Sequence, residues 1–160
     1  MPRINSSDVT VTTGTNYPPE LNSPCEGRAV ERLSQAGGIT QFGAYRVTLP
    51  PPPKDAQSWA SQRHHHSAED EFIYVLSGRP TLIDDAGETQ LRPGDSCAHP
   101  AGDGNGHHLI NTTHEPVTFL IVGTKNPQND HCRYPDADLD LPANGTSQRQ
   151  QFRKDGTPIT

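Results

Sequence analysis

Short runs of apolar residues, separated by glycine and proline, fill the middle of this chain. Residues 44–49 (AYRVTL) alternate between apolar and polar side chains and end at four consecutive prolines. Residues 72–76 (FIYVL) are mostly β-branched or aromatic and end at Ser77-Gly78. Runs of this length and composition, bounded by turn residues, are typical of β-strands.

The same pattern continues on both sides of these runs. A turn signal at 84–87 (DDAG) joins two of the runs as a hairpin, and Pro93-Gly94 makes the next turn. The predicted strands are 28–33, 44–49, 72–76, 81–83, 88–91, 95–98, 107–111 and 117–122. Only 26–35 also fits a helical turn, and we favour the strand there. Many short strands without helical periodicity or an internal repeat predict one all-β sandwich or barrel.

The distribution of apolar residues predicts how the chain is divided. Leu, Ile, Val and Phe total 28 of 160 residues, and half of them lie between Phe72 and Val122. A compact core is therefore expected in the middle, because burial needs apolar surface concentrated in one region. We assign 1–25 to an N-terminal arm, 26–124 to the barrel, and 125–160 to a C-terminal tail that packs on the barrel or on a partner subunit.

Charge and cysteine content exclude several classes of protein. The net charge is −6 and no basic run exceeds two residues, so the basic surface of a nucleic-acid-binding protein is missing. No stretch has the ~20 apolar residues of a membrane helix, and the first residues lack the apolar segment of a signal peptide. Three cysteines without a Cys-x-x-Cys spacing predict reduced thiols rather than a disulfide framework. We expect a cytoplasmic protein.

The eight histidines give the strongest chemical signal. All lie between positions 64 and 131, and His64, His65 and His66 are consecutive. Because side chains alternate along a strand, His64 and His66 point to one face and His65 to the other. Two imidazoles and the nearby carboxylate of Glu71 form a mixed nitrogen and oxygen ligand set that suits one divalent ion of Fe, Mn, Ni, Zn or Co.

Two spacings extend this signal into a family resemblance. The first is His-x-His-(x)4-Glu-(x)6-Gly, from His64 to Gly78, and the second is Gly94-(x)5-Pro100-x-Gly102, followed by His107-(x)3-Asn111. Together they resemble the two motifs of the cupin family. The resemblance implies a double-stranded β-helix, or jelly-roll, barrel in which His64, His66, Glu71 and His107 bind the metal.

The chain departs from the family pattern at two places. Ser58 stands where the first motif usually begins with glycine. Four residues, 103–106, replace the usual two before the second-motif histidine, which leaves His107 or His108 as the inward-facing residue. We favour His107, because its spacing to Asn111 is kept. His65 and His108 are then expected to point away from the ion, at the surface or on a dimer face.

Two further residues are candidates for catalysis. Glu69 shares a strand face with Glu71, so it is a candidate for orienting a histidine or for replacing Glu71 as a ligand; a solvated acid is the alternative. His99, directly before Pro100, is a candidate proton shuttle or an exposed histidine of the barrel rim. Three aromatic residues either line the cavity or pack in the core; these are Tyr45, Trp59 and Phe119.

The resemblance implies several activities and does not choose among them. We expect a metal-dependent enzyme that acts on a small oxygen-rich metabolite, such as a sugar or a hydroxy or keto acid. The segment 130–139 is similar to the tail of bacterial one-domain cupins described as sugar-phosphate-isomerase-like, which favours an isomerase. An Fe(II) dioxygenase and a noncatalytic binding module are the alternatives. Asp136 and Asp138 in this segment are candidates for cation binding or for solvated loop acids.

Small cupins commonly pair as dimers. We therefore expect a homodimer, and we predict that 44–49 and the polar arms make the contact between subunits.

Overall fold

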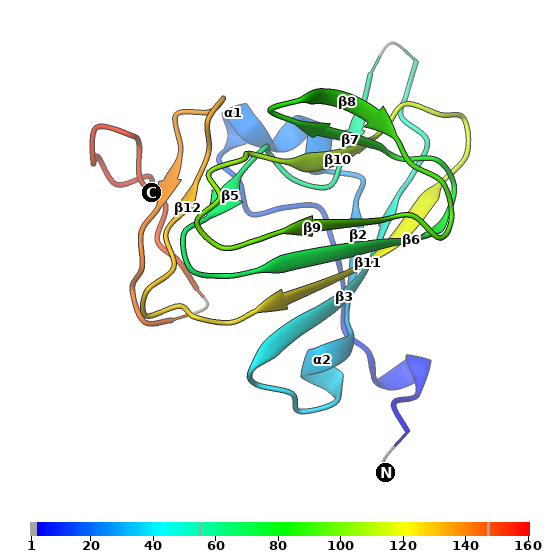
Figure 1. The fold of residues 1–160 in the computed structure, drawn as a ribbon, viewed down its shortest axis with the longest axis horizontal. Coiled ribbons are helices and arrows are strands. Elements are labelled where there is room, and N and C mark those ends of the chain that lie inside the picture. Colours follow the sequence, from blue (N-terminus) through cyan, green and yellow to red (C-terminus); the bar gives the residue numbers. More distant parts are fainter. Residues whose placement is uncertain (1–2, 55, 147) are drawn as a thin grey trace.

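The computed structural model describes residues 3–54, 56–146 and 148–160. Two antiparallel sheets face each other (Figure 1). The larger sheet has the order β1 (Val11–Thr13), β2 (Ala29–Arg32), β3 (Phe42–Leu49), β11 (Val117–Thr124), β6 (Glu71–Ser77) and β9 (Ser96–His99). The second sheet has the order β4 (Ser58–Trp59), β10 (His108–Asn111), β7 (Thr81–Asp84) and β8 (Gly87–Gln90). The predicted all-β jelly-roll barrel is confirmed.

A third, smaller sheet and four short helical turns complete the described part of the chain. The sheet has the order β13 (Asp140–Leu141), β12 (Cys132–Arg133) and β5 (His65–His66). The helical turns are η1 (Ser6–Asp8), α1 (Pro19–Asn22), η2 (Ser23–Cys25) and α2 (Leu33–Ala36). None of these turns is long enough to cross a bilayer.

Strand β6 shows why the apolar runs form this barrel. Ile73 and Val75 are 3% and 1% exposed and point into the core, whereas Phe72, Tyr74 and Leu76 are about 40% exposed on the outer face (42%, 39% and 44%). This alternation is the period of a strand with one buried face. The core cluster that β6 joins consists of Val47, Leu49, Ala60, Ile73, Val75, Leu91, Leu109, Val117 and Phe119.

Two residues of the sequence motifs have structural roles. Gly78 ends β6 with φ +76°, and a Cβ there would lie 2.6 Å from the side chain of Val117, so the turn requires glycine. Asn111 is fully buried; its amide donates to the carbonyls of Leu49, Pro50 and Glu115. It therefore fixes the turn that leads from β10 into β11.

Three expectations need correction. The predicted strand 28–33 ends at Arg32, because the chain turns into α2 at Leu33. The segment 44–49, expected to pair subunits, lies in β3, and β3 is hydrogen-bonded to β2 and β11 on its two sides. It therefore has no free edge for a partner. The N-terminal segment is not only extended: β1 pairs with β2 and adds an edge strand to the larger sheet.

The two ends of the chain pack together beside the barrel. Cys132, Tyr134, Ala137 and Leu139 form a second buried cluster, and Tyr17 and Leu21 of the N-terminal segment pack against it. Tyr17 and Tyr134 meet edge to face, with ring centroids 5.9 Å apart. In Figure 1 the orange β12 lies next to β5, and β12 pairs with β5 in antiparallel register.

Candidate metal centre

Three separate elements bring the predicted ligands to one end of the barrel. His64 and His107 exchange both backbone hydrogen bonds, at 3.1 and 2.9 Å, so they lie directly opposite each other. Glu71 is the first residue of β6. His66 ends β5, which is hydrogen-bonded to Cys132 and Arg133 of β12.

Side-chain donor atoms converge in this region. One atom each of His64, Glu71 and His107 lie within 4.8 Å of one another. Nε2 of His107 is 3.3 Å from Oε1 of Glu71. The rings of His64 and His66 meet edge to face at 5.1 Å, and the ring of His64 lies 5.2 Å from that of His107. The structure thus gathers His64, Glu71 and His107 into one group of donor atoms, and His64 and His66 with Cys132 into another, so His64 is common to both.

The hydrogen bonds of the three imidazoles are arranged alike. Nδ1 of His64 is 2.9 Å from the carbonyl of Gln62, and Nδ1 of His107 is 3.3 Å from the carbonyl of Asn105. Nδ1 of His66 is 2.7 Å from Oδ2 of Asp130. Each of these oxygens can only accept, so each Nδ1 must carry the proton. The three Nε2 atoms are left to bind a proton or a metal ion, as metal-ligating histidines require.

These donors fit one divalent transition-metal ion. Three ligands bound to one ion at about 2.1 Å lie about 3–4 Å apart, and donor atoms of His64, Glu71 and His107 lie within 4.8 Å of one another, so side-chain shifts of about 1 Å or less bring them onto one ion. A cation between Nε2 of His107 and Oε1 of Glu71 satisfies both atoms at once. Cys132 Sγ also lies within 4.8 Å of donor atoms of His64 and His66. Sequence reasoning had assigned Cys132 only a structural role.

Burial shapes the charges of this cluster. It lowers the pKa of His64 to about 3, with His66 adding to the effect, so His64 is neutral at physiological pH. Burial opposes ionisation of Glu71, but the hydrogen bond from His107 and the neighbouring His64 outweigh it and lower the pKa to about 2. The centre therefore holds an ionised carboxylate beside the neutral imidazole of His64, and a metal ion would replace the proton through which Nε2 of His107 contacts Glu71.

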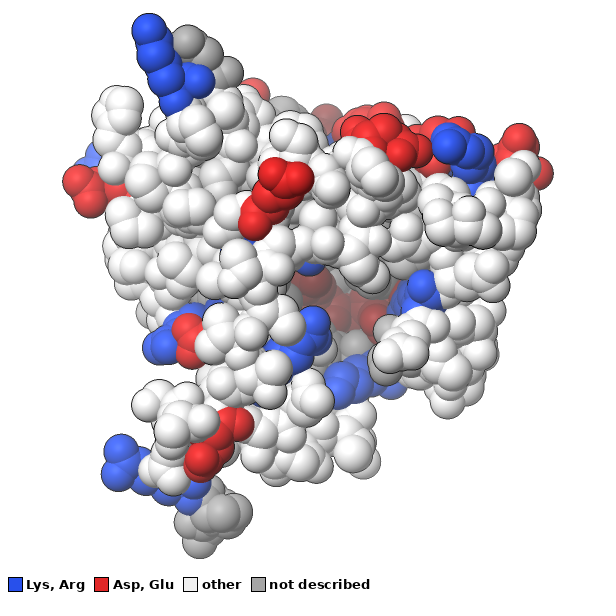
Figure 2. All heavy atoms as spheres, turned by 180° about the vertical axis from the view of Figure 1, so that it is seen from behind, with Lys and Arg blue, Asp and Glu red and all other residues white. Residues whose placement is uncertain are grey.

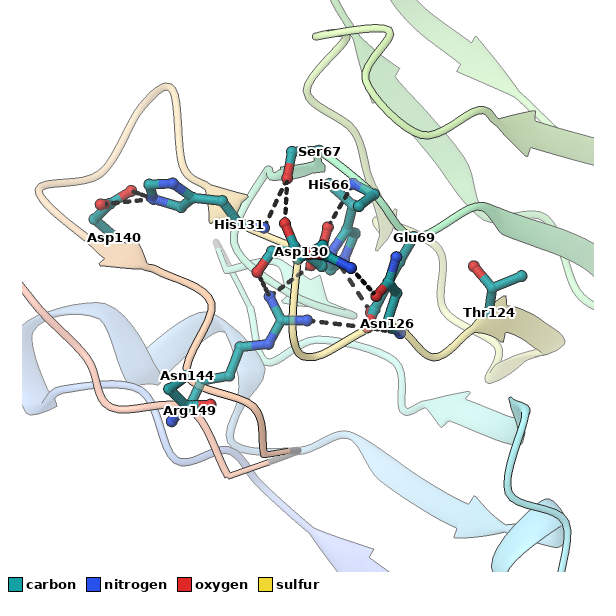
Figure 3. A network of polar contacts seen from close by, with 12 residues as sticks. His66, Ser67, Glu69, Thr124, Asn126, Asp130, His131, Asp140, Asn144 and Arg149 are labelled. Atoms are coloured by element: carbon teal, nitrogen blue, oxygen red, sulfur yellow. Dashed lines mark hydrogen bonds and ion pairs between the residues drawn. The ribbon is translucent and has the colours of Figure 1, made fainter.

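A buried ionic network supports His66 from behind (Figure 3). The side chain of Asp130 is fully buried; it accepts from the backbone N–H of Ala68 at 2.8 Å and lies 2.5 Å from the guanidinium of Arg149. Arg149 also contacts Glu69 at 3.1 Å. Burial opposes ionisation of Asp130, yet the hydrogen bonds from His66 and Ala68 hold the pKa of its carboxyl well below the usual range. Asp130 thus fixes the proton on Nδ1 of His66.

Asp130 and Arg149 were missed from the sequence. They lie in the polar tail, and the contact of Asp130 with His66 spans 64 positions of the chain. No local spacing reveals such a contact. The similarity of 130–139 to the tail of one-domain cupins was the signal in this region, and the candidates there were Asp136 and Asp138. Asp136 pairs with Arg63, and Asp138 with Arg153.

The two catalytic candidates lie in different surroundings. Glu69 lines a cavity at the metal centre; its Oε1 accepts from the backbone N–H of Asn126 at 2.7 Å and from Arg149. His99 is buried and stacks on the ring of His107 at 3.4 Å, outside the residues that line the described cavities. Burial, with His107 adding to it, lowers the pKa of His99 to about 4.

The structure places the remaining candidates as follows. His107 faces Glu71, whereas the ring of His108 packs on Trp59 at 4.8 Å, and its Nδ1 donates to the carbonyl of Ser61. His108 is 6% exposed, so its predicted surface position is wrong. Tyr45 and Phe119 line a cavity, and Trp59 does not line it.

Two cavities meet at the cluster. The inner one, about 570 Å³, runs through the barrel, and the outer one, about 1120 Å³, extends toward the tail. His64, Glu71 and Tyr45 line both. Figure 2 shows a hollow with Asp and Glu atoms at its base and Lys and Arg atoms around it. A small polar molecule entering this hollow reaches the predicted metal ligands.

Comparisons with known proteins agree with this geometry. The model of the cupin domain family matches residues 53–123. The crystal structure of a protein named as a sugar phosphate isomerase from a cupin superfamily, from Silicibacter pomeroyi, is 41% identical, with a TM-score of 0.87 over 99% of this chain and 97% of that one. No curated protein matches.

More distant structures share only the fold. A predicted oxalate decarboxylase from Thermotoga maritima is 23% identical, with a TM-score of 0.56 over 78% of this chain and 99% of that one. The polyketide cyclase RemF from Streptomyces resistomycificus is also 23% identical, with a TM-score of 0.59 over 78% and 79%. These names describe different reactions, so the likeness does not select a reaction.

Proposed function

Because this chain belongs to the cupin superfamily, we propose that it is a metal-dependent isomerase of a small oxygen-rich metabolite, a sugar or a hydroxy or keto acid. His64, His66, Glu71 and His107 hold one divalent ion of the Fe, Mn, Ni, Zn or Co group. The observation that carries the proposal is the convergence of these side chains, with each Nδ1 already engaged, where the two cavities meet. The name of the 41% identical protein favours a sugar phosphate as substrate.

The bound ion supplies a Lewis acid that polarises a carbonyl or hydroxyl oxygen of the substrate. An isomerisation then moves one proton between neighbouring carbons and needs no oxidant or reductant. Glu69 is our candidate for moving that proton. Its Oε1 is held by Asn126 and Arg149, whereas Oε2 makes only a 3.9 Å contact with Nδ1 of His66.

Tyr45 is a second group that can act on the substrate. It lines both cavities, and burial raises the pKa of its hydroxyl, so the group stays protonated as a hydrogen-bond donor at neutral pH. A noncatalytic binding module is expected to have only apolar and neutral groups around its ligand. The presence of the carboxylate of Glu69 in the cavity lining argues for an enzyme.

Two measurements test the proposal. Elemental analysis of protein purified without added metal is expected to find one transition-metal ion per chain, and much less in His107→Ala. His114→Ala is the matched control, because His114 is an exposed histidine on the loop after β10. Next, the metal-loaded protein is incubated in D₂O with a panel of aldose and ketose phosphates and the matching hydroxy and keto acids.

Proton transfer at carbon incorporates deuterium into the substrate, which ¹H NMR detects even where the product is unknown. Glu69→Gln is expected to lower the exchange rate by about a hundredfold or more, the usual contribution of a general base. Absence of exchange in the whole panel contradicts the isomerase. Oxygen consumption by the Fe(II) form would support the dioxygenase alternative instead.

A further inference from the structure

Strand β2 directs two arginines into the inner cavity. Arg28, Val30 and Arg32 alternate along this segment and all three line that cavity. Arg32 also lines the outer cavity, so this residue lies where the two cavities meet. Both cavities include His64 and Glu71, which places Arg32 in the same space as the predicted metal ligands.

The two arginines differ in what they already bind. Arg28 donates from Nε to the carbonyl of Gly14 at 2.9 Å and from a terminal nitrogen to the carbonyl of Ala60. It thereby ties the N-terminal segment to the barrel. In the described part of the chain, the arginines that pair with carboxylates are Arg46, Arg63, Arg149 and Arg153, and Arg32 is not among them. Its contact is with the face of Tyr45, 6.0 Å from the ring centroid.

Tyr45 connects Arg32 to the metal centre. The two residues are opposite each other in the register of β2 and β3, and both line both cavities. The hydroxyl of Tyr45 also lies close enough to Glu69 and Glu71 for their charges to act on it. The cavity lining therefore includes the cation of Arg32, the ring of Tyr45 and the carboxylates of Glu69 and Glu71. Figure 2 shows the same contrast of basic and acidic atoms around the hollow.

A partly buried cation without a carboxylate partner is costly unless a ligand neutralises it. The fork of a guanidinium matches the oxygens of a phosphate or carboxylate group. The inner cavity of about 570 Å³ has the size of a small-molecule site. We propose that Arg32 binds the phosphate or carboxylate group of an anionic metabolite whose other oxygens face His64, Glu71 and His107. This inference rests on the proposed function, and it narrows the substrate to an anion.

Three ligands with one carbon skeleton test the inference: glycerol 3-phosphate, glycerate and glycerol. Each is titrated by calorimetry into the full chain, first after metal removal and then after loading with Zn²⁺. We expect at least one of the two anions to bind the metal-free protein saturably and glycerol not to bind. The tighter anion identifies whether phosphate or carboxylate is preferred.

Arg32→Gln is expected to weaken anion binding by about ten- to a hundredfold, the usual effect of a charge-assisted hydrogen bond. Arg46→Gln is the matched control. Arg46 lies on β3, is 46% exposed and pairs with Glu31. Its substitution therefore removes the same charge as Arg32→Gln, but outside the cavity. The control should bind within about twofold of the unmodified protein, because exposed charges are screened. Arg32→Lys keeps the charge without the planar fork and should give an intermediate loss.

Three results would overturn the inference: neither anion binds the metal-free protein, glycerol binds as tightly as the anions, or Arg32→Gln binds like Arg46→Gln. The comparison with glycerol needs no variant, so it tests whether the cavity prefers an anion even where Arg32→Gln fails to fold. Failure of the proposed function is separate. It appears as missing metal or missing deuterium exchange, while anion binding that depends on Arg32 remains.

Discussion

Replacing Asp130 by asparagine removes a buried negative charge while keeping the size of the side chain. Oδ2 of Asp130 faces two donors, Nδ1 of His66 and the guanidinium of Arg149, and Oδ1 faces the N–H of Ala68. An asparagine has one oxygen and one NH₂ group for these two positions. If the NH₂ group takes the place of Oδ2, it faces the donors of His66 and Arg149. If it takes the place of Oδ1, it faces the N–H of Ala68. Both orientations leave donors unsatisfied.

The effect on metal binding follows from the tautomer of His66. An NH₂ group facing Nδ1 favours the form with the proton on Nε2, which removes the lone pair that binds the ion. In the opposite orientation an uncharged oxygen replaces the carboxylate facing Nδ1, which makes Nε2 a weaker donor to the metal. The loss of such a supporting carboxylate typically weakens metal affinity about 10- to 100-fold, equivalent to about 1.4–2.7 kcal/mol. We also expect the metal-free protein to lose about 2–3 kcal/mol of stability. This is less than the usual cost of breaking a buried ion pair, because Arg149 keeps Glu69 as its partner.

Competition with a chromophoric chelator for Zn²⁺ or Co²⁺ measures the affinity, and urea denaturation measures the stability. Asp140→Asn is the matched control. Asp140 accepts from Nε2 of His131 at 2.7 Å, so it is the other histidine–carboxylate pair of the tail, and it lies apart from the metal ligands (Figure 3). Equal metal affinity in the two variants would refute the role of Asp130.

Two further predictions concern pH and register. The metal-free protein should lose stability in urea melts between pH 7 and pH 4, by about 3 kcal/mol from each of His64 and His99, because the unfolded chain binds protons near pH 6.5 that these two residues accept only near pH 3 and 4 in the folded chain. His66, whose pKa the Asp130 hydrogen bond raises against the effect of burial, offsets part of this loss, and a stability that rises on acidification would contradict the assignment. His107→Ala should abolish stoichiometric metal binding in elemental analysis, whereas His108→Ala should keep the metal and lose about 1–2 kcal/mol through its contacts with Trp59 and Ser61. Loss of the metal in His108→Ala but not in His107→Ala would show that His108 is the ligand.

Local pattern predicted the barrel because its strands are local features. The β-branched run 72–76 and the turns at Gly78 and Pro93-Gly94 are encoded within a few residues, and the structure forms them as expected. The spacing of His64, His66 and Glu71 was sufficient to place them together for the same reason. The neighbours of a strand are not encoded in this way. The segment 44–49 has the composition of an edge strand, yet β2 and β11 cover both sides of it.

The residues around the proposed metal centre could not be predicted from the sequence pattern, because they come from segments that are far apart in the chain. Arg149 lies in a polar stretch of the tail outside the named strands of the described residues, and only the fold brings it to Glu69 and Asp130. Arg32 presents the same difficulty. An arginine in a short alternating strand can face solvent or the interior, and the sequence does not say which face of β2 meets the cavity.

His66, one of the proposed metal ligands, depends on the tail for both position and chemistry. Strand β5 has only two residues and is too short to be rigid alone, but β12 holds it by backbone hydrogen bonds at His65 and His66. The same tail supplies Asp130, which fixes the tautomer of His66, and Arg149, which neutralises Asp130 and holds Glu69. A barrel with the motif residues alone would contain the four donors without the contacts that orient His66. The tail is therefore part of the proposed metal centre, because the contacts that hold the tail against the barrel also orient the imidazole of His66.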